Sequence, residues 1–212
     1  MNAVPAPMQR NAKTRPLGEL VQVVGGGTPS KQNPAFWSGK IPWVSPKDMK
    51  VFDLNDAQDH VSEEAIEASA ANLVQPGAVL IVVRGMILVR SFPVAINRVP
   101  VVFNQDMKAL LPKPELDAEY LARFLQAMER TILGERDTVT HGTLKLDTDD
   151  ILSLAVPLPG SLADQRELAK RIAAQMAQVA TVRAAAERQL KASEALRTAL
   201  LRTAFGVSVE EA

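Results

Sequence analysis

Short apolar runs, separated by Pro, Gly and Asn, recur through the first 160 residues of the chain and predict strands. The run LGELVQVV (17–24) ends at three successive glycines, which predicts a strand followed by a tight, exposed turn. AVLIVV (78–83) has the length and composition of a buried strand. Further runs predict a small, mostly antiparallel sheet and lie at 94–96, 101–103, 109–111 and 152–159, the last confined to an edge or end by its prolines.

Two segments with helical features interrupt these strands. Ser62, followed by two glutamates, has the cap and the acidic first turn of a helix that continues to about Ala71. Between 117 and 133 apolar residues recur at helical spacing, and Gly134 stands where a C-terminal cap belongs. The polar stretch 135–150 is expected to be a surface loop. Strands and helices together predict an α+β fold.

The final segment differs from the rest because it runs over roughly 43 residues without Pro or Gly. As a helix with a rise of about 1.5 Å per residue it would be about 65 Å long. Ser161 and Asp164 form a start that resembles a capping box, and Gly206 is a stop signal. The pattern therefore predicts one long helix over 161–206.

Positions along this helix keep the alternating spacing of four and three residues that forms a coiled-coil seam, although its middle is polar and small. Two arrangements are open: the helix folds back onto the preceding domain, or it pairs with a second helix. That domain is too short to cover the whole seam, which favours pairing. The residues assigned to dimerisation are Leu168, Ile172, Val179, Val182, Leu196 and Leu200.

These patterns divide the chain into a flexible tail (1–14), a globular domain (15–160), a long helix (161–206) and a second tail (207–212). Cysteine is absent and there are only two histidines, so a disulfide framework or a protein-only zinc site is not expected. There is no run of eighteen apolar residues, and the N-terminus lacks the apolar core of a signal peptide. We therefore expect a soluble, cytoplasmic protein.

The formal net charge of zero is unevenly distributed, which changes what it implies about partners. Residues 1–60 carry seven basic and five acidic groups, whereas residues 116–160 carry four basic and eight acidic groups. Affinity for nucleic acid comes from neutralising phosphates, so the overall charge argues against such a partner. The mildly basic first portion still permits a local basic face.

Motifs for catalysis are missing or weak. GGGTPSK lacks the spacing of a phosphate-binding loop, and neither G-x-S-x-G nor a dinucleotide fingerprint occurs. Asp48-Met-Lys50 and Asp106-Met-Lys108 resemble the acid and lysine pairs of nucleases, but such triplets arise by chance in a chain with 23% charged residues. Asp48 has the alternative role of capping the turn around Pro46. We expect a non-catalytic chain without a metal or another cofactor.

Several motifs occur in an order that resembles the specificity (S) subunits of Type I restriction-modification systems. The resemblance extends from about 15 to 205 and rests on GGGTPS (25–30), FWSGKIPWVSPKDM (36–49), PGAVL (76–80), NQD (104–106), HGTLK (141–145), VPLP (156–159) and DQRELA (164–169). In that family a target recognition domain contacts DNA and is followed by a spacer helix, and a usual subunit has two such units in tandem. This chain has one of each, so the resemblance implies a half-subunit that pairs with a second chain.

The resemblance implies a DNA-binding protein that directs DNA adenine methyltransferase subunits, and a restriction subunit where one is present, to their target. A two-fold homodimer would bind an interrupted inverted-repeat site. Polar residues in loop contexts are the candidate DNA contacts, and among them we favour Arg84 and Lys145. The full set is Thr28, Ser30, Lys31, Lys47, Arg84, Arg90, His141, Thr143 and Lys145.

Trp37 and Trp43 have two interpretations, since aromatic side chains stack on unpaired bases or anchor an irregular loop. Anchoring is favoured, because a segment broken by Pro and Gly has little regular backbone hydrogen bonding to hold it. For the whole chain two other classes stay open. One is a coiled-coil interaction or scaffold protein without DNA specificity, motivated by the neutral charge. The other is a nuclease that acts through the acid-x-lysine triplets.

Overall fold

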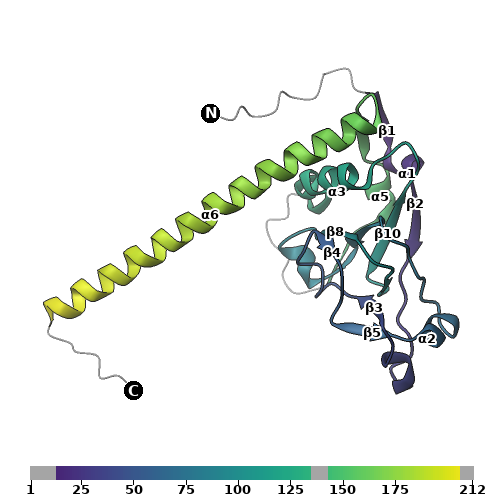
Figure 1. Cartoon of the computed structure of the whole chain (residues 1–212), viewed down its shortest axis with the longest axis horizontal. Helices are drawn as coiled ribbons and strands as arrows, with labels where there is room; N and C mark the ends of the chain where they lie inside the picture. The colour runs from purple at the N-terminus through teal and green to yellow at the C-terminus, as the bar shows by residue number, and fades with distance from the viewer. Residues whose placement is uncertain (1–12, 135–142, 206–212) are drawn as a thin grey trace. The chain divides into compact units, whose positions relative to one another are not determined.

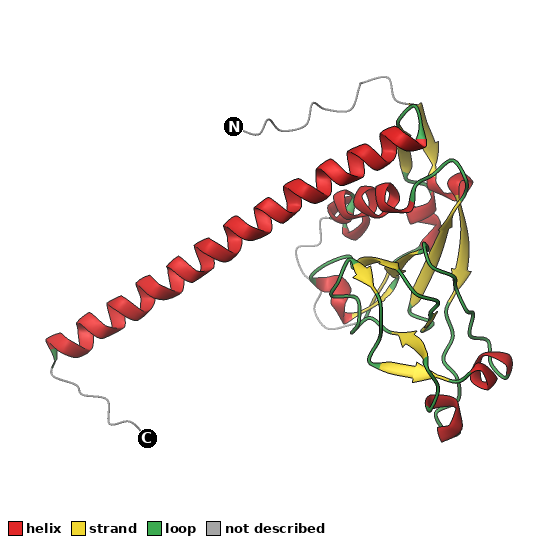
Figure 2. Cartoon of the chain, in the orientation of Figure 1, coloured by secondary structure: helices red, strands yellow, loops and turns green. Residues whose placement is uncertain are grey.

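The computed structural model describes residues 13–134 and 143–205 and has two compact units, Met1–Ala169 and Lys170–Ala212. The first unit contains a five-stranded sheet of order β2-β10-β6-β8-β4, in which only β4 and β8 are parallel neighbours among the described strands (Figures 1 and 2). Its strands are β2 (Val21–Gly25), β10 (Met107–Pro112), β6 (Val79–Val82), β8 (Val94–Asn97) and β4 (Asp53–Leu54).

A three-stranded sheet of order β5-β3-β9 lies in the same unit, with β3 antiparallel to β5 and parallel to β9. Two further ladders have two antiparallel strands each, β1 with β12 and β7 with β11. The bounds are β3 (Ile41–Val44), β5 (Asp59–Val61), β9 (Val102–Phe103), β1 (Lys13–Pro16), β12 (Ala155–Leu158), β7 (Arg84–Gly85) and β11 (Leu144–Lys145). The predicted α+β class is confirmed. The described strands form several sheets, two of them mixed, rather than the one small sheet that was predicted.

The main core lies between the five-stranded sheet and α3 (Ala118–Ala127). All four residues of β6 are buried, and α3 turns Tyr120, Leu121 and Leu125 toward the sheet. Burial raises the pKa of Tyr120 to about 12, so its hydroxyl stays protonated and donates to the Pro157 carbonyl of β12. This hydrogen bond joins α3 to β12, which lies outside the five-stranded sheet.

The predicted strand over 17–24 is wrong in its first half, because Leu17–Leu20 form the short helix α1. Leu17 and Leu20 are both fully buried. Residues three apart share one face of a helical turn but lie on opposite faces of a strand, so only the helix buries both. The predicted exposed glycine turn is also wrong, since Gly25 ends β2 and Gly27 is buried.

Other helix boundaries differ from the prediction by a few residues. Ser62 caps α2 (Glu63–Glu67) as expected, but this helix ends before Ala71. The helix predicted over 117–133 breaks at Met128 into α3 and α4 (Glu129–Leu133). Two short helices of the 3-10 type were not predicted, η1 (Pro34–Trp37) and η2 (Met86–Val89).

The stretch predicted to be a loop over 135–150 contains two elements in its described part, β11 and the start of α5 (Thr148–Leu152). Asp147 caps α5 by accepting a hydrogen bond from the backbone N–H of Asp149, and Ile151 is buried. The strand predicted over 152–159 is accordingly shortened to β12. Among the described strands it pairs with β1 alone, which agrees with its expected place at an edge.

A single helix, α6 (Leu162–Ala204), spans 43 residues (Figure 1). Ser161 begins it as predicted, because its hydroxyl oxygen accepts from the Asp164 N–H and the hydroxyl donates to the Asp164 carboxylate. The predicted stop at Gly206 lies outside the described residues. None of the helices in the described ranges is long and apolar enough to cross a membrane.

Candidate nucleic-acid interface

The ends of five strands meet at one edge of the domain. Gly25 ends β2 opposite Lys108 of β10, and Val82 ends β6 opposite Met107 of the same strand. The parallel strands β3 and β9 end side by side, with Val44 in register with Phe103. The segments that follow these strand ends, together with the β11 ladder partner of β7, form what we call the sheet rim: residues 25–28, 45–48, 84–85, 104–106 and 143–145.

The turn Asn104–Asp106 connects the segments of the sheet rim. The Asn104 side-chain oxygen accepts from the Asp106 N–H at 3.1 Å and closes the turn. The Asp106 carbonyl accepts from the N–H groups of Val83 and Arg84 at 2.8 and 3.1 Å. On the other side, the Thr28 hydroxyl donates to the Gln105 side-chain oxygen. This turn was quoted above only as a motif, and its role as the connection was missed.

Gly26 packs so closely against this turn that no side chain fits at its position. A Cβ atom on Gly26 would lie 2.0 Å from the Asn104 carbonyl oxygen and 2.5 Å from that of Phe103. Both are backbone atoms, which cannot move aside as a flexible side chain can. The glycine is required by close approach of two backbones, rather than by a turn with a positive φ.

Arg84 and Lys145, the two favoured DNA contacts, lie directly opposite each other in the antiparallel ladder of β7 and β11. Both side chains are exposed. Residues opposite each other in such a ladder place their side chains on the same face. The Arg84 Nε donates to the Asp106 carboxylate at 2.5 Å. The fold therefore brings two cations, sixty-one positions apart in the chain, to one place on the sheet rim.

Trp37 and Trp43 hold the segment that leads away from the sheet rim. Trp43 is buried and its Nε1 donates to the Gly27 carbonyl at 3.0 Å, while the Trp37 Nε1 donates to the Ser30 carbonyl at 3.2 Å. The two rings meet edge to face, with centroids 5.1 Å apart. Their anchoring role is confirmed, and the burial of Trp43 leaves it no face for stacking on a base.

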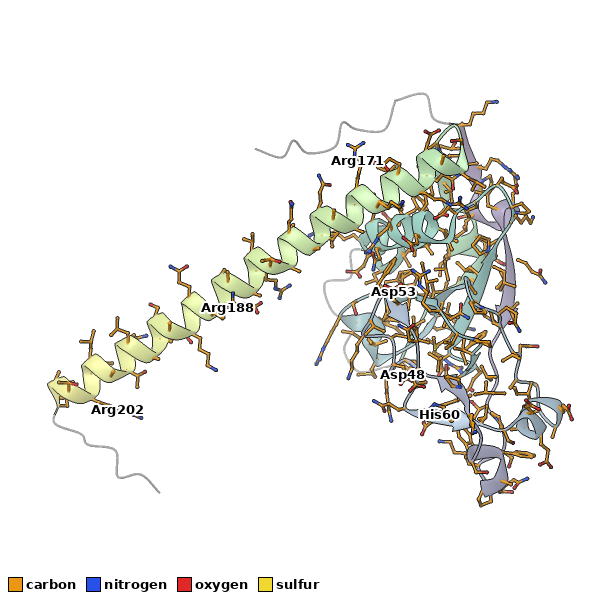
Figure 3. The ribbon with its side chains drawn as sticks, in the orientation of Figure 1. Asp48, Asp53, His60, Arg171, Arg188 and Arg202 are labelled. Atoms are coloured by element: carbon orange, nitrogen blue, oxygen red, sulfur yellow. The ribbon has the colours of Figure 1, made fainter. Side chains whose placement is uncertain are left out.

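The turn 45–48 presents Lys47 to solvent and uses Asp48 to hold its shape. One oxygen of Asp48 accepts from the N–H and the hydroxyl of Ser45, and the other accepts from the Gln58 N–H at 3.0 Å. Lys47 of the same turn is exposed. The position of Asp48 in the domain is labelled in Figure 3. Asp48 is thus the structural acid of this turn, as the alternative interpretation of its triplet expected.

The remaining predicted contacts, apart from Thr143, lie outside the segments that define the sheet rim. Lys31 is exposed with its ammonium 5.7 Å from the Trp37 ring centroid, and Ser30 is joined to the same ring through its carbonyl. Arg90 is exposed at the end of η2, and Thr143 is exposed just before β11. His141 lies outside the described residues. The β7–β11 ladder therefore brings Arg84, Thr143 and Lys145 together, and the hydrogen bond to Gln105 joins Thr28 to the same rim. Lys47 lies on the rim turn 45–48, whereas Ser30, Lys31 and Arg90 lie outside the segments that define the rim.

A metal site is not indicated in the described part of the chain, where no three acidic or histidine side chains are grouped so as to hold an ion. The carboxylates of both acid-x-lysine triplets already accept hydrogen bonds from protein donors, Asp48 from its own turn and Asp106 from Arg84. This arrangement lends no support to the nuclease hypothesis.

The predicted dimerisation residues differ in their surroundings. Leu168 belongs to the first unit and packs partly against its core, beside the buried Ala169. In the second unit Ile172 is half-buried, and the rest of the set is 61–68% exposed: Val179, Val182, Leu196 and Leu200. Arg171, Arg188 and Arg202 mark α6 from near its start to near its end (Figure 3).

The chain was compared with known proteins. The family model described as the Type I restriction modification DNA specificity domain matches residues 9–191. The specificity subunit of the Escherichia coli type I restriction enzyme EcoR124I/EcoR124II is 35% identical over 151 residues, 71% of this chain and 37% of that protein. The MjaIX specificity subunit of Methanocaldococcus jannaschii is 30% identical over 108 residues, 50% of this chain and 24% of that protein.

Solved structures share the fold. One comes from a study described as the structural basis of complex assembly and conformational transition of the type I R-M system. It has a TM-score of 0.72 at 21% identity, and the match covers 95% of this chain and 47% of that chain. The crystal structure of the HsdS subunit from Thermoanaerobacter tengcongensis has a TM-score of 0.60 at 20% identity, with 84% and 41% covered. The chain therefore spans less than half of each of these four proteins.

Proposed function

The chain belongs to the Type I restriction modification DNA specificity family, and from that premise we propose that it selects the DNA sequence on which a Type I restriction-modification system acts. The observation that carries the proposal is the sheet rim, where Arg84 and Lys145 lie opposite each other. Arginine suits guanine edges and lysine suits phosphates, so the pair has the chemistry for recognising a duplex.

The proposed interface is centred on the sheet rim and uses Thr28, Lys47, Arg84, Thr143 and Lys145. Ser30, Lys31, Arg90 and His141 are proposed as outer contacts to the DNA backbone, since phosphates along a duplex are reached from many directions. The carboxylates of Asp48 and Asp106 are engaged by protein donors, which reduces their repulsion of phosphate. The chain itself has a recognition role, and catalysis belongs to other subunits.

We propose that two copies pair through α6 and act as a homodimer in the cytoplasm. The chain has one recognition domain and one long helix, and Val179, Val182, Leu196 and Leu200 leave an exposed apolar seam. Two identical domains related by a two-fold axis would read an inverted repeat with an unread spacer. The dimer would present this site to adenine methyltransferase subunits and to a restriction subunit.

The alternative function is a scaffold that keeps the paired helix but binds no specific DNA. Salt dependence separates the two, because each phosphate contacted adds to the slope of log affinity against log salt. The full chain, purified with methyltransferase subunits, would be titrated with random-sequence duplexes at several salt concentrations, and the bound fraction sequenced. Steep salt dependence together with an enriched motif is expected. Binding that enriches no sequence, or no binding at low salt, would favour the scaffold.

A further inference from the structure

Two like charges placed opposite each other on a short exposed ladder need an explanation. Arg84 and Lys145 are register partners in β7 and β11, a ladder with only two residues on each strand. Directly opposed like charges destabilise a pair of strands. Among the described residues only Asp106 forms an ion pair with either side chain, and it does so with Arg84. The acid is therefore the one group that offsets this repulsion within the described part of the domain.

Backbone hydrogen bonds hold Asp106 in place independently of its ion pair with Arg84. Its N–H donates to the Asn104 side chain, and its carbonyl accepts from the N–H groups of both Val83 and Arg84. Its side chain is only 26% exposed, compared with 46% for Arg84. Backbone and side chain thus fix the carboxylate against the strand that carries the arginine, so the acid can orient the guanidinium.

The nitrogen of Arg84 that Asp106 binds determines which N–H donors of the guanidinium remain for DNA. The carboxylate accepts from Nε, and no other hydrogen bond of the guanidinium is found within the described residues. The two terminal nitrogens, Nη1 and Nη2, therefore keep their N–H donors for another acceptor. A guanidinium presents its donors in a rigid fork, and that fork matches the O6 and N7 acceptors of guanine in the major groove.

We propose that Asp106 is a positioning residue that fixes the Arg84 guanidinium by its Nε and directs the terminal nitrogens to one guanine of the DNA target. Lys145, opposite Arg84, neutralises the adjacent phosphate. This inference rests on the proposed function and adds to it the base that one side chain reads. The Arg84 side of this ion pair is open to solvent, and pairs screened by solvent contribute little to folding stability. The role of Asp106 should therefore appear in recognition rather than in folding.

Sequencing of duplexes selected from a random pool by the full chain with methyltransferase subunits tests this role. The variants are Asp106→Asn, Asp106→Glu and Arg84→Ala. The matched control is Asp53→Asn, because Asp53 also pairs with an arginine, Arg98, but lies on β4 away from the sheet rim. Thermal unfolding of each variant reports whether the fold is kept.

The expected result is a wild-type motif with one guanine whose preference Arg84→Ala abolishes. Asp106→Asn should reduce the preference at that same position about five- to tenfold, within the range of one good bidentate contact. Asp106→Glu should restore most of it, and Asp53→Asn should leave the motif unchanged.

Two outcomes would overturn the inference in distinguishable ways. If the wild type yields a motif and the folded Asp106→Asn variant reproduces it, or loses affinity evenly at all positions, the positioning role is wrong and the proposed function stands. If the wild type enriches no motif, the proposed function fails and this inference fails with it.

Discussion

Trp43 shows how single residues position the sheet rim from a distance. Its indole N–H holds the Gly27 carbonyl, and the Trp37 ring lies edge-on to it. These contacts fix the segment 27–30. Within that segment the Thr28 hydroxyl donates a hydrogen bond to the side chain of Gln105 in the turn 104–106. The sequence indicated this anchoring because two large rings in a segment rich in Gly and Pro have few other means of ordering it.

Gly26→Ala is predicted to destabilise the domain, whereas Gly25→Ala is predicted to be tolerated. The new methyl group on Gly26 would meet the Asn104 carbonyl oxygen at 2.0 Å, but on Gly25 it would meet only the Lys108 Nζ at 3.5 Å. We expect a loss of about 3 kcal/mol or more in the free energy of unfolding for the first variant, and about 1 kcal/mol or less in either direction for the second. Urea denaturation of both measures this, and equal losses would refute the close packing at Gly26.

Arg84→Ala and Lys145→Ala are predicted to weaken DNA binding in different ways. Loss of a base contact should cost about 1–3 kcal/mol and relax one position of the motif. Loss of a phosphate contact should weaken all sequences alike and lower the salt slope by about 1. Titrations over a range of salt, combined with selection of bound sequences, separate the two effects. A uniform loss with Arg84→Ala would contradict its role as a base reader.

At the residue scale the sequence could single out Arg84 and Lys145 but could not pair them. Each of them lies close to a glycine in a loop context, and such a pattern can be recognised from neighbouring residues in the sequence. Their opposition depends on a ladder between residues sixty-one positions apart, and no local pattern encodes that. Asp106 was visible only as part of an acid-x-lysine triplet, because its partner Arg84 is joined to it through tertiary contacts.

At the scale of elements, Gln165 fastens the first turns of α6 to the rest of the first unit. It is 2% exposed, its side-chain oxygen accepts from the Asp117 N–H at 2.8 Å, and its side-chain nitrogen donates to the Glu115 carbonyl at 3.0 Å. Arg166, the next residue, pairs with the Asp117 carboxylate. The DQRELA motif thus has a structural role that its place at the start of the helix did not reveal.

Gln165→Leu is predicted to lower the free energy of unfolding by about 1–2 kcal/mol, because two part-buried backbone groups lose their partners while the side-chain volume is kept. Glu167→Leu makes the same kind of replacement at an exposed position of the same turn and should change stability by less than about 0.5 kcal/mol. Thermal or urea unfolding of both variants measures the difference. Equal stabilities would show that Gln165 is not needed to hold the helix start.

Long periodic elements were predictable from the sequence, and short ones were not. The 43-residue α6 and the buried strand β6 follow from periodicity and apolar length. The four-residue α1 and the two-residue β11 have too few local hydrogen bonds to be stable alone, and their tertiary contacts decide their conformation. The Asp147 cap before Ile151 was the local signal that would have found α5.

At the scale of the whole molecule, the proposed dimer depends on the apolar seam of α6. Leu196 and Leu200 are 61% and 62% exposed, and a surface of this kind along a helix is normally covered by a partner. The proposed pairing of two copies rests on this exposed seam.

Leu196→Asp combined with Leu200→Asp is predicted to convert the dimer into a monomer, since buried unpaired charges in a seam are costly. Thr198→Asp is the control, because a residue two positions from both leucines faces the opposite side of the helix. Analytical ultracentrifugation at tens of micromolar protein gives the result. A wild-type monomer, or a double variant that remains dimeric, would contradict pairing through this seam.

Mapping N6-methyladenine in the genome of cells tests most directly whether two copies of this chain select DNA for methylation. The cells express the chain with its Type I methyltransferase subunits. We expect one methylated motif made of two identical half-sites in inverted orientation, separated by a spacer of fixed length. With an active methyltransferase present, either the absence of any methylated motif or a motif with two different halves would contradict it.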